Sequence, residues 1–247
     1  MFSVKELQKK KEKKEKIAMV TAYDATFAKI AEDAGIDQIL VGDSLANTML
    51  GYKSTREIGM TEMEIFVAAV CRGAKNTHVV ADMPYGSYDT KELALENAKK
   101  LLACGASSVK LEGACKEIIE TLSENKIEVM GHLGLLPQTA TSFRQCGKTL
   151  EDACRIKAEA KLLNALGIYS FVLEHIPEAL GKEITEESDA ITIGIGAGKY
   201  TDGQVLVMQD LLKMRIGKLP PFVNPTANLY EAALEGFSKY IEQVKKN

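Results

Sequence analysis

Acidic residues follow four short apolar runs in this 247-residue chain. The runs are ILVGDS (39–44), HVVADMP (78–84), SVKLEG (108–113) and FVLEHI (171–176), and the acids that follow are Asp43, Asp82, Glu112 and Glu174. Continuous aliphatic runs of this length are typical of strands buried on both faces of a parallel sheet. A carboxylate is costly to bury unless it is paired or holds a metal. The sequence therefore predicts one polar site where these strands end.

Strand alternation indicates which other side chains share that site. Side chains two positions apart lie on the same face of a strand, so Lys110 accompanies Glu112, and His132 follows Met130 on a strand of its own. We expect aliphatic residues of the same parity to fill the interior of the sheet; these are Val41, Val80, Met130 and Val172. The polar residues at its edge are then Asp43, Asp82, Lys110, Glu112, His132 and Glu174.

Several carboxylates without a cluster of Cys or His favour a hard cation. Mg²⁺ prefers one or two carboxylates together with waters and substrate oxygens. Asp43 and Asp82 come from consecutive strands and are the best pair of ligands, and Glu112 would reach the ion directly or through a water. The alternative is a set of structural ion pairs, for example with Lys110. Because several acids at one edge would repel one another, the pattern favours a cation.

Three residues have candidate roles toward a substrate. Lys110 suits a substrate carboxylate, and its proximity to Glu112 favours a charged, paired lysine over a Schiff-base nucleophile. Glu174 follows the apolar FVL, so partial burial would raise its pKa and make it a general base; a helix-capping or salt-bridged glutamate is the alternative. His132, between glycines in GHLG, either contacts a ligand or is a satisfied structural histidine.

Strand-like and helix-like segments alternate along the chain. Gly35 predicts a helix stop, and Thr61 and Glu64 have the spacing of a capping box. The expected strands are 17–24, 39–44, 78–84, 108–113, 127–134, 171–176, 190–198 and 203–210. The expected helices are 25–35, 61–73, 90–105, 115–124, 150–167, 177–187 and 227–246.

Eight strands with helices between them predict an α/β fold, a (β/α)8 TIM barrel that forms a single domain over 1–247. In this fold the active site lies at the carboxyl ends of the strands. A doubly wound open sheet competes weakly, because it would need a glycine-rich turn after the first strand, and the turn here reads AYDAT. The GIGAG segment at 194–198 is weak evidence for a nucleotide and favours close backbone approach to a ligand.

Composition excludes several classes of protein. The chain is 46% hydrophobic, enough for a sizeable core, and a net charge of −3 gives no electrostatic basis for binding nucleic acid. No apolar run approaches the roughly 18 residues of a membrane-spanning helix, so we expect no membrane partner. Five cysteines without a CxxC pair indicate reduced thiols in a cytoplasmic protein. The charged run at 9–16 predicts a solvated N-terminal helix (about 3–16), with a basic tail for an acidic partner as the alternative.

Seven motifs together resemble one known family. They are MVTAYDATFAKIAEDAGIDQILVGDS, VVADMPYGSY, VKLEG, VMGHLGLLPQ, FVLEHIP, TIGIGAG and DGQVLV. In order and spacing they resemble the ketopantoate hydroxymethyltransferase (3-methyl-2-oxobutanoate hydroxymethyltransferase) family. The resemblance extends from about residue 3 to the final helix.

The resemblance implies a Mg²⁺-dependent barrel enzyme of pantothenate and coenzyme A biosynthesis. Such enzymes transfer a hydroxymethyl group from 5,10-methylenetetrahydrofolate to 3-methyl-2-oxobutanoate (α-ketoisovalerate) and produce 2-dehydropantoate (ketopantoate). It also implies small-molecule substrates and a homo-oligomer, a ring-shaped decamer. By the family pattern, Asp43, Asp82 and Glu112 match the metal positions, Glu174 matches the proton acceptor, and the positions that bind the ketoacid are Asp43, Ser44, Asp82 and Lys110.

The chain departs from the family pattern in three loops expected at or near the site. The loop 51–59 carries Arg56 and Glu57 where neutral residues are frequent, and the loop 139–149 is shorter and lacks a Gly-Gly-Tyr stretch. Lys199, Tyr200 and Thr201 replace a usual Pro-Gly-Cys at 199–201. These differences bear on folate binding, on the choice of ketoacid and on oligomer contacts.

Two other functions remain alternatives. A related Mg²⁺-enolate carbon–carbon lyase of the isocitrate lyase type would use a similar acidic set. That group usually carries a KKCGH-like loop, which this sequence lacks. A non-catalytic barrel that serves as an assembly scaffold is the second alternative, and the intact acidic set with Lys110 argues against it.

Overall fold

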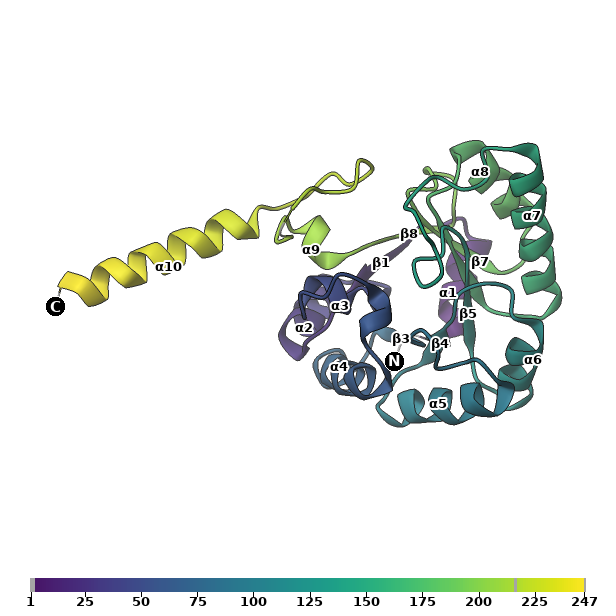
Figure 1. Cartoon of the computed structure of the whole chain (residues 1–247), viewed down its shortest axis with the longest axis horizontal. Coiled ribbons are helices and arrows are strands. Elements are labelled where there is room, and N and C mark those ends of the chain that lie inside the picture. The colour runs from purple at the N-terminus through teal and green to yellow at the C-terminus, as the bar shows by residue number, and fades with distance from the viewer. Residues whose placement is uncertain (1–2, 216, 247) are drawn as a thin grey trace. The chain divides into compact units, whose positions relative to one another are not determined.

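Eight parallel strands close into a barrel in the computed structural model, which describes residues 3–215 and 217–246 (Figure 1). Each strand pairs with the next along the chain, so the predicted (β/α)8 barrel is confirmed. The strands are β1 (Ile17–Thr21), β2 (Gln38–Val41), β3 (His78–Asp82), β4 (Ser108–Lys110), β5 (Val129–Gly134), β6 (Ser170–Glu174), β7 (Ile191–Ile195) and β8 (Gly203–Leu206).

The chain forms two compact units that meet in sequence between Val205 and Leu206. The first unit contains the barrel, and the second contains α9 (Met208–Leu211) and α10 (Leu229–Lys246). Each unit is described by itself below, and a single domain over the whole chain stays a prediction. The predicted strand over 203–210 is correct only in its first half. β8 ends at Leu206, and the short helix α9 follows it.

Helices follow most strands of the first unit and begin at residues that cap them. The side chains of Asp24, Thr90 and Thr149 each accept a backbone N–H at the start of a helix. The helices are α2 (Ala25–Asp33), α3 (Leu45–Thr48), η1 (Thr55–Glu57), α4 (Met60–Gly73), α5 (Lys91–Ala103), α6 (Lys116–Glu124), α7 (Leu150–Ala165) and α8 (Glu178–Glu186). No helix in the described part of the chain is both long and apolar enough to cross a membrane.

Two predicted helix signals have different outcomes. Gly35 has a φ of +83° and follows the end of α2, so its role as a stop is confirmed. The prediction of a capping box at Thr61 and Glu64 is wrong. The helix α4 begins at Met60, so Thr61 lies inside the helix and cannot be its N-cap residue. The carboxylate that closes its first turn belongs to Glu62, which accepts the Gly59 N–H at 2.9 Å.

Alternate residues of each strand fill the barrel interior. The interior cluster includes Val80, Met130 and Val172, as predicted, together with Ile193 and Val205. In β2 the interior residue is Leu40, so the prediction that Val41 faces inward is wrong. Because β2 ends at Val41, Asp43 reaches the site from the loop after the strand and not from the strand itself.

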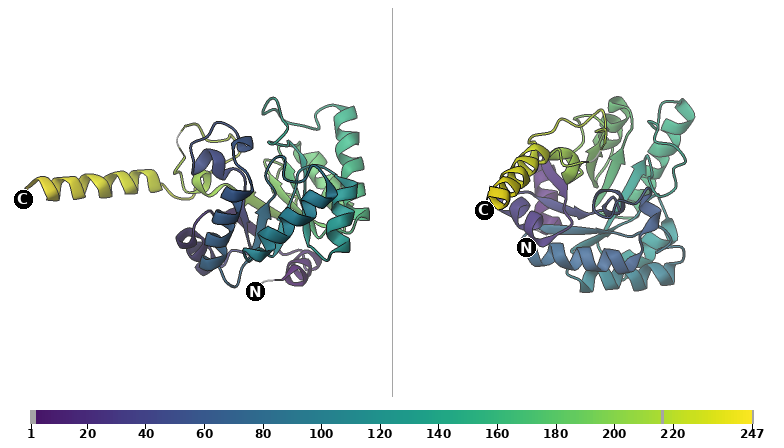
Figure 2. Two further views of the ribbon diagram at one scale, coloured as in Figure 1. Left: turned by 60° about the horizontal axis from the view of Figure 1, so that its bottom comes forward. Right: turned by 60° about the vertical axis from the view of Figure 1, so that its left-hand side comes forward.

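The charged N-terminal helix α1 (Val4–Glu12) covers the end of the barrel where the strands begin, which we call the floor. Leu7 is fully buried and packs in the interior cluster with Ile17 and Ile191, the first residues of β1 and β7. Figure 2 shows this helix at the N-terminal side of the barrel, away from the loops that follow the strands.

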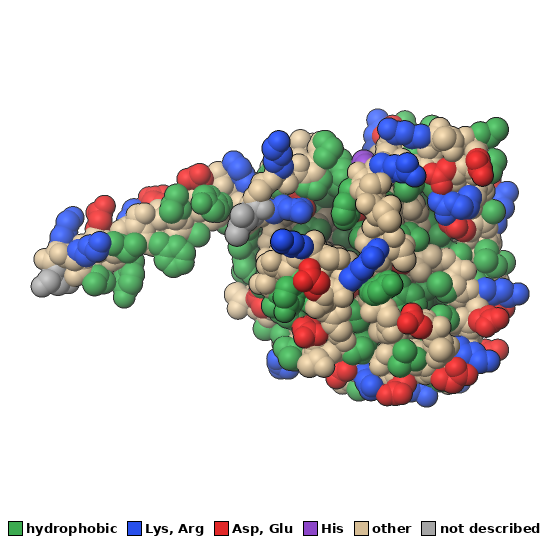
Figure 3. All heavy atoms as spheres, in the orientation of Figure 1, with side chains coloured by type: hydrophobic (Ala, Val, Ile, Leu, Met, Phe, Trp, Pro, Cys, Tyr) green, Lys and Arg blue, Asp and Glu red, His purple; other side chains and the backbone are tan. Residues whose placement is uncertain are grey.

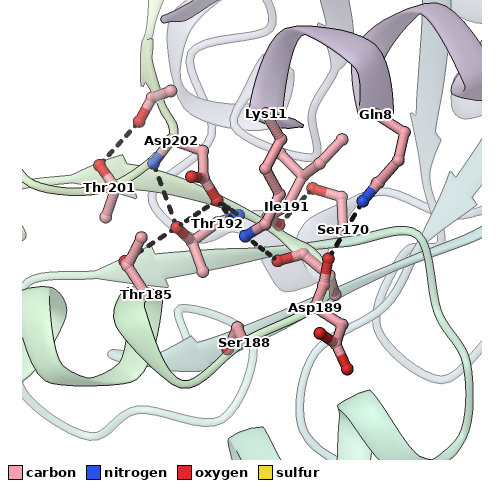
Figure 4. A network of polar contacts seen from close by, with 12 residues as sticks. Gln8, Lys11, Ser170, Thr185, Ser188, Asp189, Ile191, Thr192, Thr201 and Asp202 are labelled. Carbon is pink, nitrogen blue, oxygen red and sulfur yellow. Dashed lines mark hydrogen bonds and ion pairs between the residues drawn. The ribbon is translucent and has the colours of Figure 1, made fainter. Parts of the chain in front are cut away.

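Polar side chains of α1 bind groups at the floor, and Figure 4 shows two of them, Lys11 and Gln8. Lys11 Nζ lies 2.7 Å from Asp202 Oδ2 and 2.9 Å from the Ala190 carbonyl, and Lys10 pairs with Asp37 at 2.5 Å. Gln8 donates to the Asp189 carbonyl at 3.3 Å. A helix is present, but it ends at Glu12 and is shorter than the predicted 3–16, and it is not wholly solvated, because one face packs against the barrel.

Candidate active site

Asp82 and Lys110 form a buried ion pair at the carboxyl ends of β3 and β4, which we call the mouth. The two residues are partners in the strand register, and their side chains are only 2% and 6% exposed. Burial works to lower the Lys110 pKa, but the carboxylates of Asp82, Asp43 and Glu112 outweigh it and raise the pKa. The lysine is therefore charged and paired, as predicted, and does not suit Schiff-base chemistry.

Asp43 and Glu112 approach this pair from the loops after β2 and β4. The Asp43 N–H donates to Asp82 Oδ2 at 3.1 Å, so the two aspartates are held side by side. Burial, with repulsion from Asp82, raises the pKa of Asp43 to about 7. Burial also raises the pKa of Glu112 to about 9, and the charges of Asp43 and Asp82 add to the effect. If all three acids were ionised, they would carry more negative charge than Lys110 neutralises, and this repulsion adds to burial in favouring the protonated forms of Asp43 and Glu112.

The donor set fits a hard divalent cation such as Mg²⁺. The candidate ligands are carboxylate oxygens of Asp43, Asp82 and Glu112, all at most 7% exposed. Among the described residues, no three acidic, His or Cys side chains already surround one metal position. Mg²⁺ commonly uses only one or two carboxylates and completes its coordination with water and substrate oxygens.

His132 and Glu174 line the mouth on the side of β5 and β6. His132 Nε2 lies 3.3 Å from Glu174 Oε2, and His132 Nδ1 lies 3.8 Å from Glu112 Oε1. Burial and the Lys110 charge lower the His132 pKa, so the imidazole is neutral at pH 7. Neither ring nitrogen makes a hydrogen bond within the described structure. The Glu174 side chain is 19% exposed and is the most accessible acid of the set.

Ser44 lies beside Asp43 at the start of α3. Its Oγ is 2.8 Å from the hydroxyl of Tyr23, a fully buried side chain from the loop after β1. Burial raises the Tyr23 pKa to about 12, so the phenol keeps its proton and holds the Ser44 hydroxyl in place. The structure thus brings every residue of the predicted site to the mouth.

Sequence reasoning missed Gln138 and Tyr88. Gln138 is fully buried in the loop after β5, where its side chain donates to Asp43 and its backbone N–H donates to Glu112. Tyr88, from the loop after β3, donates to the Gln138 side chain. A glutamine after LLP and a tyrosine in a polar loop carry no charge or metal-ligand signal. Only their place in the quoted motifs could have pointed to them.

Two of the three divergent loops lie at the mouth, as expected. Arg56, in the loop 51–59, donates to the Gln138 carbonyl and lies 5.2 Å above the ring of Tyr85. In the loop 139–149, the Cys146 N–H donates to the carbonyl of His175, directly after Glu174.

The third divergent loop, 199–201, starts near the mouth, as expected, and then leaves it. The Lys199 N–H meets Glu178 at the start of α8, but the Lys199 carbonyl accepts a hydrogen bond from Lys16, just before β1. The segment therefore runs from the mouth toward the floor. The glycines before it approach the protein itself: a Cβ at Gly194 would meet Thr201, and one at Gly198 would meet Glu178.

Comparisons with known proteins agree with the barrel and identify the family. The family model for ketopantoate hydroxymethyltransferase matches residues 1–247. The 3-methyl-2-oxobutanoate hydroxymethyltransferase of Thermotoga maritima is 49% identical over 244 residues, which cover 96% of this chain and 90% of that protein.

Solved structures share the fold at low identity. A phosphonopyruvate hydrolase, solved with oxalate and Mg²⁺, gives a TM-score of 0.68 at 10% identity and covers 100% of this chain and 88% of its own. A 2,3-dimethylmalate lyase of the PEP mutase/isocitrate lyase superfamily gives 0.63 at 14% identity, with 100% and 89% coverage. At these identities the likeness concerns the fold alone. By its whole-length match and its relatives, the chain is an enzyme that belongs to the ketopantoate hydroxymethyltransferase family.

Proposed function

We propose that this protein transfers a hydroxymethyl group from 5,10-methylenetetrahydrofolate to 3-methyl-2-oxobutanoate, with Mg²⁺, and so forms 2-dehydropantoate for pantothenate biosynthesis. The observation that carries the proposal is the buried mouth, in which Lys110 pairs with Asp82 and the charges of Asp43 and Glu112 act on the same lysine. Membership of the family supports the same reaction.

The acids and Lys110 would bind the ketoacid and the cation. Asp43 and Asp82 would hold Mg²⁺, and Glu112 would reach it directly or through a water. When bound, Mg²⁺ supplies Lewis acidity, which favours loss of a proton next to a carbonyl group. The Lys110 ammonium has three donors, so it can keep its bond to Asp82 and still bind the substrate carboxylate. Ser44 would donate to the ketoacid from its fixed position beside Tyr23.

Glu174 is the proposed base. One of its carboxylate oxygens would take the proton from C3 of the ketoacid, and the C–H electrons would form the enolate. The enolate carbon then bonds to the one-carbon unit, both bonds from that unit to the folate nitrogens break, and a water supplies the hydroxyl group of the product. Tetrahydrofolate leaves with two protons, the one that Glu174 took from C3 and the one that the water released. The neutral His132 lies next to Glu174 and can accept or donate a hydrogen bond as the charge of Glu174 changes.

Solvent deuterium exchange at C3 of 3-methyl-2-oxobutanoate, followed by NMR, tests the proposal. We expect exchange that requires Mg²⁺ and falls by about 10²–10⁴-fold in Glu174→Gln, with the Mg²⁺-induced thermal shift retained. Glu178→Gln, an exposed acid at the start of α8, is the matched control and should exchange like the unaltered protein. If Glu174→Gln exchanged the C3 proton as fast as the unaltered protein, Glu174 would not be the base.

Formation of 2-dehydropantoate on addition of 5,10-methylenetetrahydrofolate tests the donor. Exchange without this product would favour a different one-carbon donor or a lyase. Absence of both exchange and cation binding would favour a scaffold.

We also propose that the protein is a homo-oligomer, a decamer by its resemblance to the family, and that it acts in the cytoplasm. The support within the chain is α10, none of whose residues is buried. Figure 3 shows hydrophobic side chains along one side of this helix. They recur at intervals of four and three residues, at Tyr230, Leu234, Phe237, Ile241 and Val244. This spacing is that of helices that pack against other helices.

A further inference from the structure

Gln138 uses all its polar groups at the mouth, although it carries no charge. Its side-chain Nε2 donates to Asp43 Oδ2 at 2.9 Å and to the Met83 carbonyl at 3.0 Å. Its backbone N–H donates to Glu112 Oε2 at 3.1 Å. The residue is fully buried, so no solvent competes for these bonds. One residue thus binds carboxylates from two separate loops.

The orientation of the Gln138 amide is fixed by its neighbours. The Met83 carbonyl can only accept a hydrogen bond, so it selects the NH₂ end of the amide, and the same nitrogen donates to Asp43 Oδ2. The opposite oxygen accepts from the Tyr88 hydroxyl. Burial and the Glu112 charge raise the Tyr88 pKa, so this hydroxyl keeps its proton and remains a donor. A reversed amide would leave donors facing donors and acceptors facing acceptors.

The backbone of Gln138 is also held from outside the site. Its carbonyl accepts a hydrogen bond from Arg56 Nε, and the Arg56 guanidinium lies over the Tyr85 ring. Arg56 is one of the residues by which this chain departs from its family pattern. The loop 51–59 is thereby attached to the residue that binds Asp43 and Glu112.

From these contacts we propose that Gln138 is a positioning residue, which sets the orientation of Asp43 and Glu112 for a divalent cation and the ketoacid. The proposal rests on the proposed function. Without the amide, the Asp43 side chain loses its hydrogen bond and is free to turn away from Asp82. The hydrogen bond that remains between the two aspartates holds only the backbone N–H of Asp43. The bond from the Gln138 backbone to Glu112 does not depend on the side chain and is retained in a substituted protein.

The test compares Gln138→Met with the unaltered protein by two measurements. Methionine matches the length of glutamine but cannot donate. Crystal structures without added metal should show the Asp43 side chain displaced and Glu112 in place. Mn²⁺, which favours the same oxygen ligands as Mg²⁺, should bind about tenfold more weakly by electron paramagnetic resonance. Turnover should show a raised KM for the ketoacid together with a reduced kcat.

Gln8→Met is the matched control. It removes a glutamine hydrogen bond to a carbonyl at the floor, far from Asp43, and should leave Mn²⁺ affinity unchanged. Asp43 in its original position in Gln138→Met, or unchanged Mn²⁺ affinity with Asp43 displaced, would overturn the positioning role. If the unaltered protein binds no Mn²⁺, the metal in the proposed function is wrong, and the crystal comparison still decides whether Gln138 orients Asp43.

Discussion

At the scale of residues, the mouth concentrates acids that are costly to keep charged. Burial raises the pKa of Asp43 and Glu112 to about 7 and about 9. A carboxyl whose pKa rises on folding binds its proton more tightly in the folded state. Its contribution to the free energy of unfolding therefore falls as pH rises from its ordinary pKa to its folded pKa. For Asp43 this window runs from 3.8 to about 7, and for Glu112 from 4.5 to about 9.

This sign predicts how pH and Mg²⁺ act together on stability. Without metal, the Tm should fall between pH 6 and pH 9 as the two acids lose their protons. Mg²⁺ should raise the Tm more at pH 9 than at pH 6, because protons compete with the cation for the same oxygens. Differential scanning fluorimetry at both pH values checks this.

Asp43→Asn is the informative variant for this prediction. The Tm of this variant should fall less between pH 6 and pH 9, and Mg²⁺ should raise its Tm less than it raises the Tm of the unaltered protein. A Mg²⁺ effect of equal size in Asp43→Asn would show that the cation binds elsewhere.

Sequence patterns predicted part of the site for sound reasons. Asp82, Lys110, His132 and Glu174 belong to strands whose alternation continues to them, so parity predicted their direction. Asp43 was placed in the site through an inward Val41, which is wrong, because β2 ends before Asp43 and the loop redirects it. Gln138 could not be predicted, because its role depends on a loop that folds back over two other loops.

At the scale of elements, α1 shows a charged helix that is also part of the core. Its lysines suggested a solvated segment, but Leu7 is its single fully buried residue among the described positions of the helix and closes the barrel interior. Val4 and Leu7 among seven charged or polar residues are too short a periodic signal to have predicted this. By contrast, helices with caps or glycine stops, such as α2, were predictable to within a few residues.

Leu7→Ala should therefore destabilise the barrel by about 2–5 kcal/mol, the range for removing a buried leucine. Chemical denaturation measures the loss. Leu150→Ala is the matched control, because Leu150 is 81% exposed and its substitution should change stability by no more than about 0.5 kcal/mol. Equal effects of the two substitutions would contradict a core role for α1.

At the scale of the whole molecule, α10 leads to a prediction about assembly. Phe237, 69% exposed, lies within the apolar stripe of α10. A charge at this position opposes burial against a second copy of the chain. Phe237→Glu should reduce the molar mass measured by light scattering, and Gln243→Glu, which lies away from the stripe, should not. Unchanged mass in Phe237→Glu would exclude α10 from the subunit interface.

The position of α1 has a practical consequence for handling the protein. The helix lies at the floor, and the acids that surround Lys110 lie at the mouth, at the other end of the strands. A tether joined ahead of Ser3 would hold the barrel by its closed end. An immobilised form attached there would leave the open end toward the solution, whereas attachment through the loops 51–59 or 139–149 would obstruct it.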